Sequence, residues 1–219
     1  MMRLVFLGAP GVGKGTQADK AAVQYGIRKI STGDLLRGAV RDKTPLGLEA
    51  KEHMDQGRLV PDSVVIGLVR EKLADLSHAT GFILDGFPRT VLQAEILGKV
   101  LAERGLQLDR VINFKVPREE IVKRLSGRRS CPKCQATYHV EFAPSQSGRL
   151  CERCGETLVQ RSDDQREAIE MRLRVYEEQT APLINFYEKQ RLLLDLNGAE
   201  AVETVYRNLV KALATTPTA

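Results

Sequence analysis

A glycine-rich segment near the start of the chain is the feature best suited to chemistry. The run Gly8–Thr16 has the sequence Gly-Ala-Pro-Gly-Val-Gly-Lys-Gly-Thr and directly follows the apolar residues Leu4–Leu7. Glycines let backbone N–H groups converge on an anion, and Lys14 adds a mobile positive charge for the outer phosphates of a nucleotide. A strand, a glycine loop and a helix in this order are typical of a phosphate-binding loop. We therefore predict that this phosphate loop holds a nucleotide.

The phosphate loop departs from the common pattern at one position. The residue after the lysine is Gly15, and the hydroxyl that usually helps to hold Mg²⁺ comes one place later, at Thr16. Carboxylates are the other candidates to hold Mg²⁺ or its waters, and we single out Asp85, which ends an apolar run, and Asp34. Asp34 equally suits the N-cap of a helix.

Four cysteines form the second candidate site. Cys131 and Cys134 are separated by two residues, as are Cys151 and Cys154, and 16 residues separate the pairs. Two such turns present four thiolates in the tetrahedral arrangement that zinc prefers. A closed four-thiolate shell leaves no open position, so we predict a structural metal that replaces a hydrophobic core. The alternatives are four reduced thiols or two disulfides. We expect His139 to be a hydrogen-bonding or packing residue outside the cluster.

Arginines stand where positive charge could gather. Phosphoryl transfer requires little covalent chemistry from a protein and depends on positioning and positive charge. Arg37, Arg89, Arg128 and Arg161 each adjoin a glycine, a proline or the edge of an insertion, and Arg172 lies on the helix that follows. We predict that Asp163 and Asp164 cap that helix, with Asp163 also orienting an arginine of the insertion.

The elements that must position these residues follow an alternating rhythm. Short apolar runs predict strands at Leu4–Leu7, Arg28–Ser31, Gly81–Leu84, Arg110–Phe114 and Leu192–Leu196. Helical stretches lie at 14–25, 33–42, 46–56, 62–76, 90–104, 118–125, 164–190 and 201–213, and Pro182 should kink the seventh or mark a boundary in it. The closing residues Thr215–Ala219 look frayed. The pattern predicts an α/β fold, a parallel sheet with helices on both faces.

Two segments break this rhythm. Residues 31–60 hold helices without an apolar strand, and residues 128–161 are rich in Gly, Pro, Cys and Arg with a β-like stretch at Ala136–Val140. We predict that they are insertions in a core formed by residues 1–30, 61–127 and 162–219. Insertions at the carboxyl edge of such a sheet are well placed to bind a second substrate or to close over the site.

Bulk properties narrow the function classes. The chain has 219 residues and a net charge of +5, from 33 Lys and Arg against 28 Asp and Glu. That mild excess suits anionic ligands and is not a nucleic-acid-binding tail. No apolar stretch is long enough to span a bilayer, and Met1–Leu7 is too short for a secretory signal. We expect a cytoplasmic protein with no membrane partner; an organelle stays open if a transit peptide was removed.

Taken together, several motifs resemble the adenylate kinase family over essentially the whole chain from Arg3. These are the phosphate loop, Ser31–Arg37, Asp85–Thr90, Gly127–Arg129, Arg161–Asp164 and Thr180–Leu183. The cysteine segment is similar to that of the long-lid, zinc-bearing bacterial form. The resemblance implies a five-stranded parallel P-loop sheet with a helical AMP-binding insertion and a zinc-containing lid. It implies reversible phosphoryl transfer from Mg-ATP to AMP, giving two ADP, by a monomer.

The resemblance also implies roles for individual residues. ATP phosphates would be held by Gly11, Val12, Gly13, Lys14, Gly15 and Thr16 together with Arg128, and its nucleoside by Arg124, Thr137, Tyr138 and the loop that ends at Glu200. AMP would be held by Thr32, Arg37, Arg58, Leu59, Val60, Gly86, Phe87, Pro88, Arg89, Gln93, Arg161 and Arg172. The catalytic residues would be Lys14, Arg89, Arg128, Arg161 and Arg172, with Asp34 and Asp85 holding Mg²⁺ through water. Gln135 departs from the family, which often has glycine after the second cysteine.

Three other functions are alternatives to adenylate kinase activity. Basic residues around the cysteines suit a nucleic-acid-binding zinc module fused to an ATPase, but that segment has few stacking aromatics. A kinase for another nucleoside monophosphate, such as UMP or CMP, stays open, since Thr32, Val60 and Gln93 favour adenine only through the resemblance. A GTPase switch is disfavoured because the sequence has no Asn-Lys-x-Asp segment.

Overall fold

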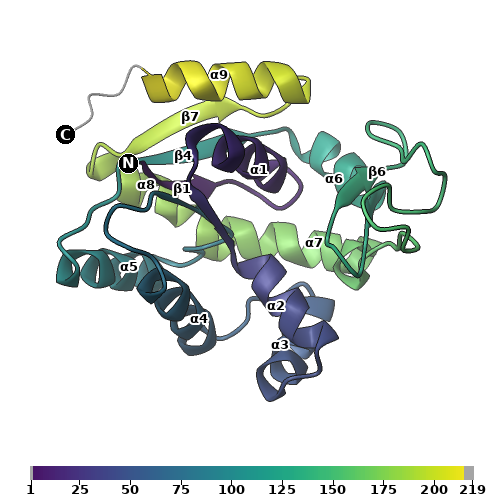
Figure 1. Ribbon diagram of the computed structural model, residues 1–219, viewed down its shortest axis with the longest axis horizontal. Helices are drawn as coiled ribbons and strands as arrows, with labels where there is room; N and C mark the ends of the chain where they lie inside the picture. Colours follow the sequence, from purple (N-terminus) through teal and green to yellow (C-terminus); the bar gives the residue numbers. More distant parts are fainter. Residues whose placement is uncertain (1, 215–219) are drawn as a thin grey trace.

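A five-stranded parallel sheet organises the structure, a computed structural model that describes residues 2–214 (Figure 1). The predicted frayed residues Thr215–Ala219 lie outside the described part. The sheet has the order β2-β3-β1-β4-β7. Its strands are β1 (Arg3–Leu7), β2 (Arg28–Ser31), β3 (Phe82–Asp85), β4 (Arg110–Lys115) and β7 (Leu193–Asn197). All four neighbouring pairs are parallel. The predicted α/β fold is confirmed, with strand ends shifted by one residue in several cases.

Helices cover both faces of the sheet because side chains alternate along each strand. Val5 and Leu7 of β1 belong to one buried apolar cluster, whereas Leu4 and Phe6 belong to the other. The first cluster includes α4 (Asp62–Ala74), α5 (Val91–Glu103) and α8 (Pro182–Lys189). The second includes α1 (Lys14–Tyr25), α6 (Arg118–Ser126), α7 (Arg166–Val175) and α9 (Val202–Ala214).

The helical insertion is a pair of helices, α2 (Thr32–Arg41) and α3 (Pro45–Asp55), that projects at the bottom of Figure 1. Ser31 caps α2, and its hydroxyl accepts a hydrogen bond from the Asp34 backbone N–H. The alternative in which Asp34 is the N-cap is therefore wrong. Its carboxylate lies inside the first turn and is free to pair with cations. A Cβ at Gly47 of α3 would lie 2.0 Å from the Ala39 carbonyl oxygen, which shows how closely the two helices pack.

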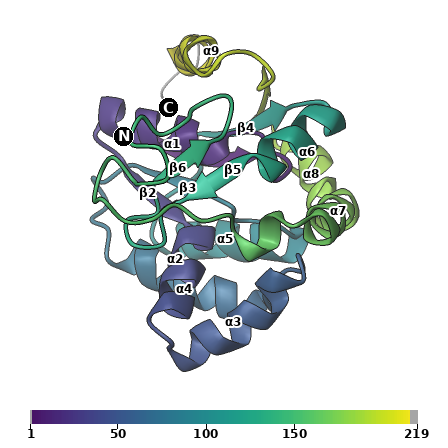
Figure 2. The ribbon, with the colours of Figure 1, turned by 90° about the vertical axis from the view of Figure 1, so that its right-hand side faces the viewer.

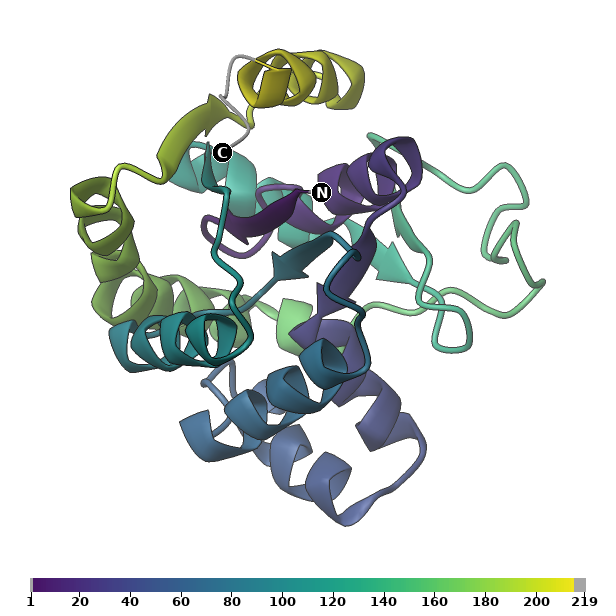
Figure 3. The same cartoon turned by 60° about the vertical axis from the view of Figure 1, so that its left-hand side comes forward.

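The cysteine insertion is built mainly of turns. Its regular structure is a short antiparallel pair, β5 (Arg128–Ser130) and β6 (Thr137–His139), which confirms the β-like stretch that was predicted. Its buried cluster consists of Cys131, Ala136 and Cys151. Figure 3 shows its loops extending away from the sheet at the right, with the helical insertion at the bottom, and in Figure 2 the same loops lie in front of the sheet.

The predicted long helix over 164–190 is interrupted. A 3₁₀ turn at Ser162–Asp164 precedes α7, and a π-helical turn at Tyr176–Thr180 separates α7 from α8, which begins at Pro182. The predicted boundary at Pro182 is confirmed, because proline fits the first turn of a helix and not its interior. The predicted caps are wrong: Gln165 is the N-cap of α7, without a side-chain hydrogen bond. In the described residues, no helix is both long and apolar enough to cross a membrane.

Candidate active site

The phosphate loop lies between the end of β1 and α1. Gly8, Gly11 and Gly13 have φ angles of 136°, 84° and 95°, which side-chain-bearing residues rarely adopt. Gly13 is the N-cap of α1 and makes no side-chain cap. The helix N-terminus therefore keeps its N–H groups for an anion. Lys14 Nζ lies over the loop and donates to the carbonyl oxygens of Gly8 at 2.7 Å and Ala9 at 2.8 Å.

Lys14 shares its surroundings with arginines from three other segments. Burial lowers its pKa to about 8; Asp85 opposes the shift, and Arg89, Arg172 and Arg128 add to it. Charges of one sign gathered in a partly buried site repel one another. An anionic ligand would relieve that repulsion, so the cluster is suited to polyphosphate.

Two neighbouring aspartates hold the arginines in place. Arg128 donates from Nε and Nη2 to the two carboxylate oxygens of Asp164, at 2.7 and 2.6 Å. Arg172 Nη1 donates to Asp164 Oδ1 at 3.0 Å and to the Asp163 carbonyl oxygen at 2.8 Å. The Asp164 side chain is fully buried between the two guanidinium groups. The prediction from sequence gave an arginine-orienting role to Asp163 alone and missed this role of Asp164, although two acids next to Arg161 were a usable signal.

Arg161 and Arg89 complete the cluster. Arg161 Nε donates to Ser130 Oγ at 2.7 Å; burial, then Arg128 and Arg37, lower its pKa to about 9. Arg89 Nε donates to the Gly86 carbonyl oxygen at 2.7 Å; burial, then Arg172, lower its pKa to about 10. The predicted catalytic residues thus converge from the core and the cysteine insertion.

A pocket lies beside this cluster, between the helical insertion and the core. Eight of the twelve predicted AMP residues line it: Thr32, Arg37, Arg58, Leu59, Val60, Arg89, Gln93 and Arg172. Gly86, Phe87, Pro88 and Arg161 are not among its lining residues, whereas Asp163 is. The Gln93 amide is already bonded within the protein, accepting from Arg89 N–H and donating to Asp62 Oδ1, each at 2.7 Å. Asp62 is a second residue that the sequence analysis missed.

The residues predicted to hold the ATP nucleoside are also engaged with the protein. Arg124 donates to the carbonyl oxygens of Gly198 at 2.8 Å and Ala199 at 3.3 Å, and so fixes that loop. The Glu200 carboxylate accepts from Asn208 at 2.9 Å. The Tyr138 hydroxyl accepts from Glu152 N–H at 3.0 Å and lies 3.6 Å from Cys151 Sγ. Thr137 is exposed on β6.

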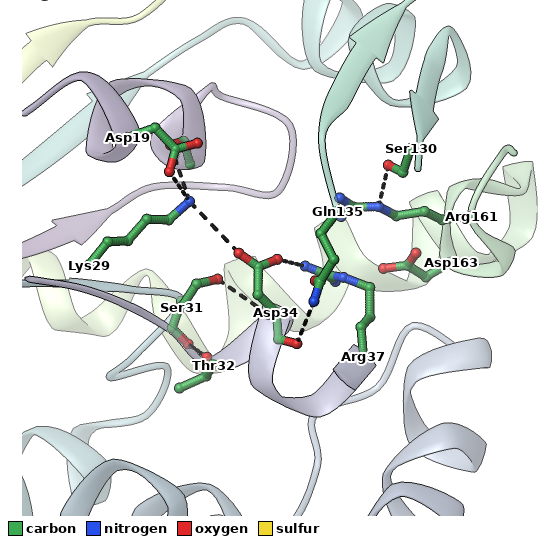
Figure 4. A network of polar contacts seen from close by, with 12 residues as sticks. Asp19, Lys29, Ser31, Thr32, Asp34, Arg37, Ser130, Gln135, Arg161 and Asp163 are labelled. Atoms are coloured by element: carbon green, nitrogen blue, oxygen red, sulfur yellow. Dashed lines mark hydrogen bonds and ion pairs between the residues drawn. The ribbon is translucent and has the colours of Figure 1, made fainter. Parts of the chain in front are cut away.

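The two predicted magnesium carboxylates differ. A Cβ at Gly15 would lie 3.4 Å from Asp85 Oδ2, so this carboxylate lies against the first turn of α1. Asp34 instead accepts from Arg37 Nη2 at 2.6 Å and lies 3.7 Å from Lys29 Nζ (Figure 4). Burial opposes its ionisation, but Arg37 and Lys29 hold the pKa of Asp34 below its usual range. Asp85 is the better placed of the two.

The four cysteine sulfurs lie together. All are free thiols, with every pair of Sγ atoms within 4.8 Å, including 3.4 Å for Cys131 with Cys154 and 3.5 Å for Cys134 with Cys151. These separations are too long for disulfides at about 2.05 Å and suit Sγ atoms at about 2.3 Å from one metal ion. Burial opposes ionisation of Cys151, but hydrogen bonds from Tyr138 and the Arg153 backbone lower its pKa to about 6.

His139 is outside the cysteine cluster, as predicted. Its Nδ1 accepts from the backbone N–H groups of Glu141 and Phe142, each at 3.0 Å, and its ring stacks on Phe142 at 4.4 Å. The histidine is therefore a buried hydrogen-bonding residue of the cysteine insertion.

Comparison with known proteins decides the family. A model of the family described as adenylate kinase matches residues 6–192. An adenylate kinase of Carboxydothermus hydrogenoformans is 53% identical over 212 residues, covering 97% of this chain and 99% of the relative. The chain belongs to the adenylate kinase family. Adenylate kinases of Geobacter sulfurreducens and Archaeoglobus fulgidus are 51% and 50% identical, covering 96% and 95% of this chain and 97% and 96% of the relatives.

Membership of the adenylate kinase family confirms the predicted activity. The chain is a nucleoside monophosphate kinase, a phosphotransferase that uses Mg-ATP and binds ATP, AMP and ADP as substrates. The four cysteines could hold a metal ion.

Proposed function

We propose that ATP binds with its phosphates on the phosphate loop while AMP occupies the pocket between α2, α3 and the core. The observation that carries this assignment is that Arg89, Arg128 and Arg172 lie near Lys14 of the phosphate loop, while Arg89 and Arg172 also line the pocket. Buried positive charges that lower one another's pKa are stabilised by a polyanion, and two nucleotides meeting by their phosphates supply one.

In this assignment, an oxygen of the AMP phosphate attacks the γ-phosphorus of ATP, and the bond from that phosphorus to the β-γ bridging oxygen breaks. The AMP phosphate is already a nucleophile, so no strong general base is required. Lys14 and the arginines would stabilise the charge that develops on the transferring group, in a site closed to water by the two insertions.

Mg²⁺ would supply further charge neutralisation at the β- and γ-phosphates of ATP. We assign the water-mediated hold on it to Asp85 first, since this carboxylate lies against the turn that carries Lys14 and Gly15. Asp34 takes at most a supporting part, because its carboxylate is paired with Arg37 and Lys29.

We propose that zinc is the metal of the cysteine cluster. Four thiolate donors and no open coordination position suit a structural zinc ion and no catalytic role. The ion would hold the cysteine insertion together, and that insertion, as residues 128–161, would act as the lid over ATP. Residues 31–60 would act as the AMP-binding unit, and the remainder as the core.

Specificity for AMP over other monophosphates is the part of the proposal most open to test. A coupled assay that offers ATP with AMP, UMP, CMP and GMP in turn should give the largest kcat/KM with AMP. The runner-up is a UMP or CMP kinase, since the Gln93 amide that lines the pocket is already bonded to Arg89 and Asp62. A larger kcat/KM with UMP or CMP than with AMP would show that the pyrimidine monophosphate is the preferred acceptor.

We also propose a cytoplasmic monomer that binds no nucleic acid. The four free thiols suit a reducing compartment. Size-exclusion chromatography with light scattering should give the mass of one chain. A salt titration of any RNA or DNA binding should show no steep dependence.

A further inference from the structure

The two cysteine turns have the same backbone arrangement but differ in the residue that closes them. The first turn, Cys131–Gln135, is closed by a hydrogen bond from Gln135 N–H to the Cys131 carbonyl oxygen at 3.0 Å. The second turn, Cys151–Gly155, is closed by Gly155 N–H to the Cys151 carbonyl oxygen at 2.8 Å. The closing residue has a φ of 61° in the first turn and 71° in the second.

Gln135 has two free-energy costs that Gly155 lacks, one in its backbone conformation and one in its side chain. A positive φ is uncommon for residues with a Cβ, and glycine adopts it freely. The Gln135 side chain is partly buried, and its Oε1 is buried without a hydrogen-bond partner among the described residues. A Cβ at Gly155 would meet no atom within 4 Å, so the second turn is not kept small by crowding. The first turn therefore uses a costly residue where a glycine would serve.

The Gln135 side chain reaches the other insertion. Its Nε2 donates to the carbonyl oxygen of Asp34 at 3.3 Å, across 101 residues of sequence (Figure 4). A second contact lies beside it, from Arg41 Nη1 to the Lys133 carbonyl oxygen at 3.3 Å. Both contacts join the first cysteine turn to α2. The hydrogen bonds described for the second turn stay within the cysteine insertion.

Asp34 links the Gln135 contact to the AMP pocket, because it contacts Gln135 through its backbone and Arg37 through its side chain. It lies in the first turn of α2, and its carboxylate holds the guanidinium of Arg37 at 2.6 Å, one turn further along. Arg37 lines the pocket. A hydrogen bond on the Asp34 backbone therefore fixes the helix turn from which Arg37 is aimed.

We propose that Gln135 is a positioning residue that couples closure of the cysteine insertion over ATP to the affinity of the pocket for AMP. The proposal rests on the assignment of ATP and AMP to their two sites. A contact made only when the cysteine insertion lies on α2 stabilises that arrangement, and each nucleotide that favours it then strengthens the binding of the other. Such coupling is reciprocal.

The test measures AMP binding by calorimetry, alone and with a saturating ATP analogue that has a methylene between its β- and γ-phosphorus atoms. Gln135→Met keeps the length and the φ cost but loses the donor; Gln135→Gly removes the side chain and relieves the φ cost. Both should weaken AMP roughly threefold in the presence of the analogue, within the range of one neutral hydrogen bond, and leave AMP binding alone unchanged. Gly155→Gln is the matched control and should keep the wild-type coupling.

Each other outcome overturns the inference. Equal AMP affinity in wild type and both variants, with the analogue present, would make Gln135 a turn residue only. Equal weakening with and without the analogue would make it a direct part of the pocket. Loss of coupling in Gly155→Gln, or loss of bound metal in Gln135→Met, would trace the effect to the turn itself. Arg37→Ala tests the site assignment separately, because it should weaken AMP binding both with and without the analogue. Unchanged AMP binding in Arg37→Ala would mean that the assignment of AMP to this pocket is wrong.

Discussion

The sheet core and the cysteine insertion are stabilised in different ways. The sheet has an apolar cluster on each face, with 19 and 18 buried residues among those described; Leu36, Ala50 and Val60 of the first come from the helical insertion. The buried cluster of the cysteine insertion has three residues, and two of them are cysteines. Apolar burial supports the core, whereas the insertion depends on what its thiols bind. We therefore expect the core to keep its fold when a side chain of the site is removed. We expect the cysteine insertion to lose its fold when its metal-binding cysteines are replaced.

The largest effect is expected from Arg89→Ala, which tests the core side of this comparison. Arg89 lies at the meeting point of loop and pocket, so the change should lower kcat/KM by roughly 10³-fold. The melting temperature should stay close to wild type because the apolar clusters are untouched. Arg70→Ala, on the exposed face of α4, is the control. An unchanged turnover would remove Arg89 from the site.

A cavity in the apolar core should lower the stability of the fold, whereas the Arg89 change should lower activity alone. Ile112 is fully buried in β4, and Ile112→Ala should lower the free energy of unfolding by about 3 kcal/mol through lost burial and the cavity left behind. Denaturant unfolding gives that value, with Val23→Ala, at an exposed position, as the control. Metal content should be unaffected. Loss of the metal in Ile112→Ala would mean that core and insertion unfold as one unit.

Replacing Cys131 and Cys134 together by serine tests the insertion. Bound zinc should fall from one ion per chain to none, and the melting temperature by on the order of 10 °C, since each kcal/mol shifts it by roughly 2–4 °C at this length. Turnover at low temperature should fall less than tenfold, because the loop and pocket stay in place. Elemental analysis and calorimetry check both. Freshly purified wild type without zinc would contradict the structural role.

The smallest effect concerns pH. Lys14 is charged below its pKa of about 8 and loses that charge as pH rises through it. The charged fraction falls about threefold between pH 7.5 and 8.5, so the KM for ATP should rise by about that factor. Lys14→Met should remove this pH dependence along with most of the activity. A KM for ATP that is flat across that interval would show that ATP is held without the Lys14 charge.

The fold was largely predictable because most strands are short apolar runs between turn residues, although β2 has Ile30 as its one apolar residue. The phosphate loop and the four cysteines were predictable because their chemistry fixes their spacing. The role of Asp164 was not: an acid before a helix predicts a cap, and only the folded chain brings Arg128 and Arg172 onto the Asp164 carboxylate. The Asp34 and Gln135 contact also joins residues 101 positions apart, which no local pattern records.

The buried Asp164 has a consequence for turnover. Its carboxylate occupies guanidinium donors of Arg128 and Arg172 that nucleotide phosphates would otherwise claim. In the proposed site, nucleotide phosphates would compete with this permanent internal anion, and part of the binding free energy of each nucleotide would be cancelled. An enzyme that converts one polyanion into another of nearly equal charge would hold its product about as tightly as its substrate. Slow product release would then limit turnover. We expect the internal carboxylate to weaken the hold of both arginines on product phosphates and so to speed product release.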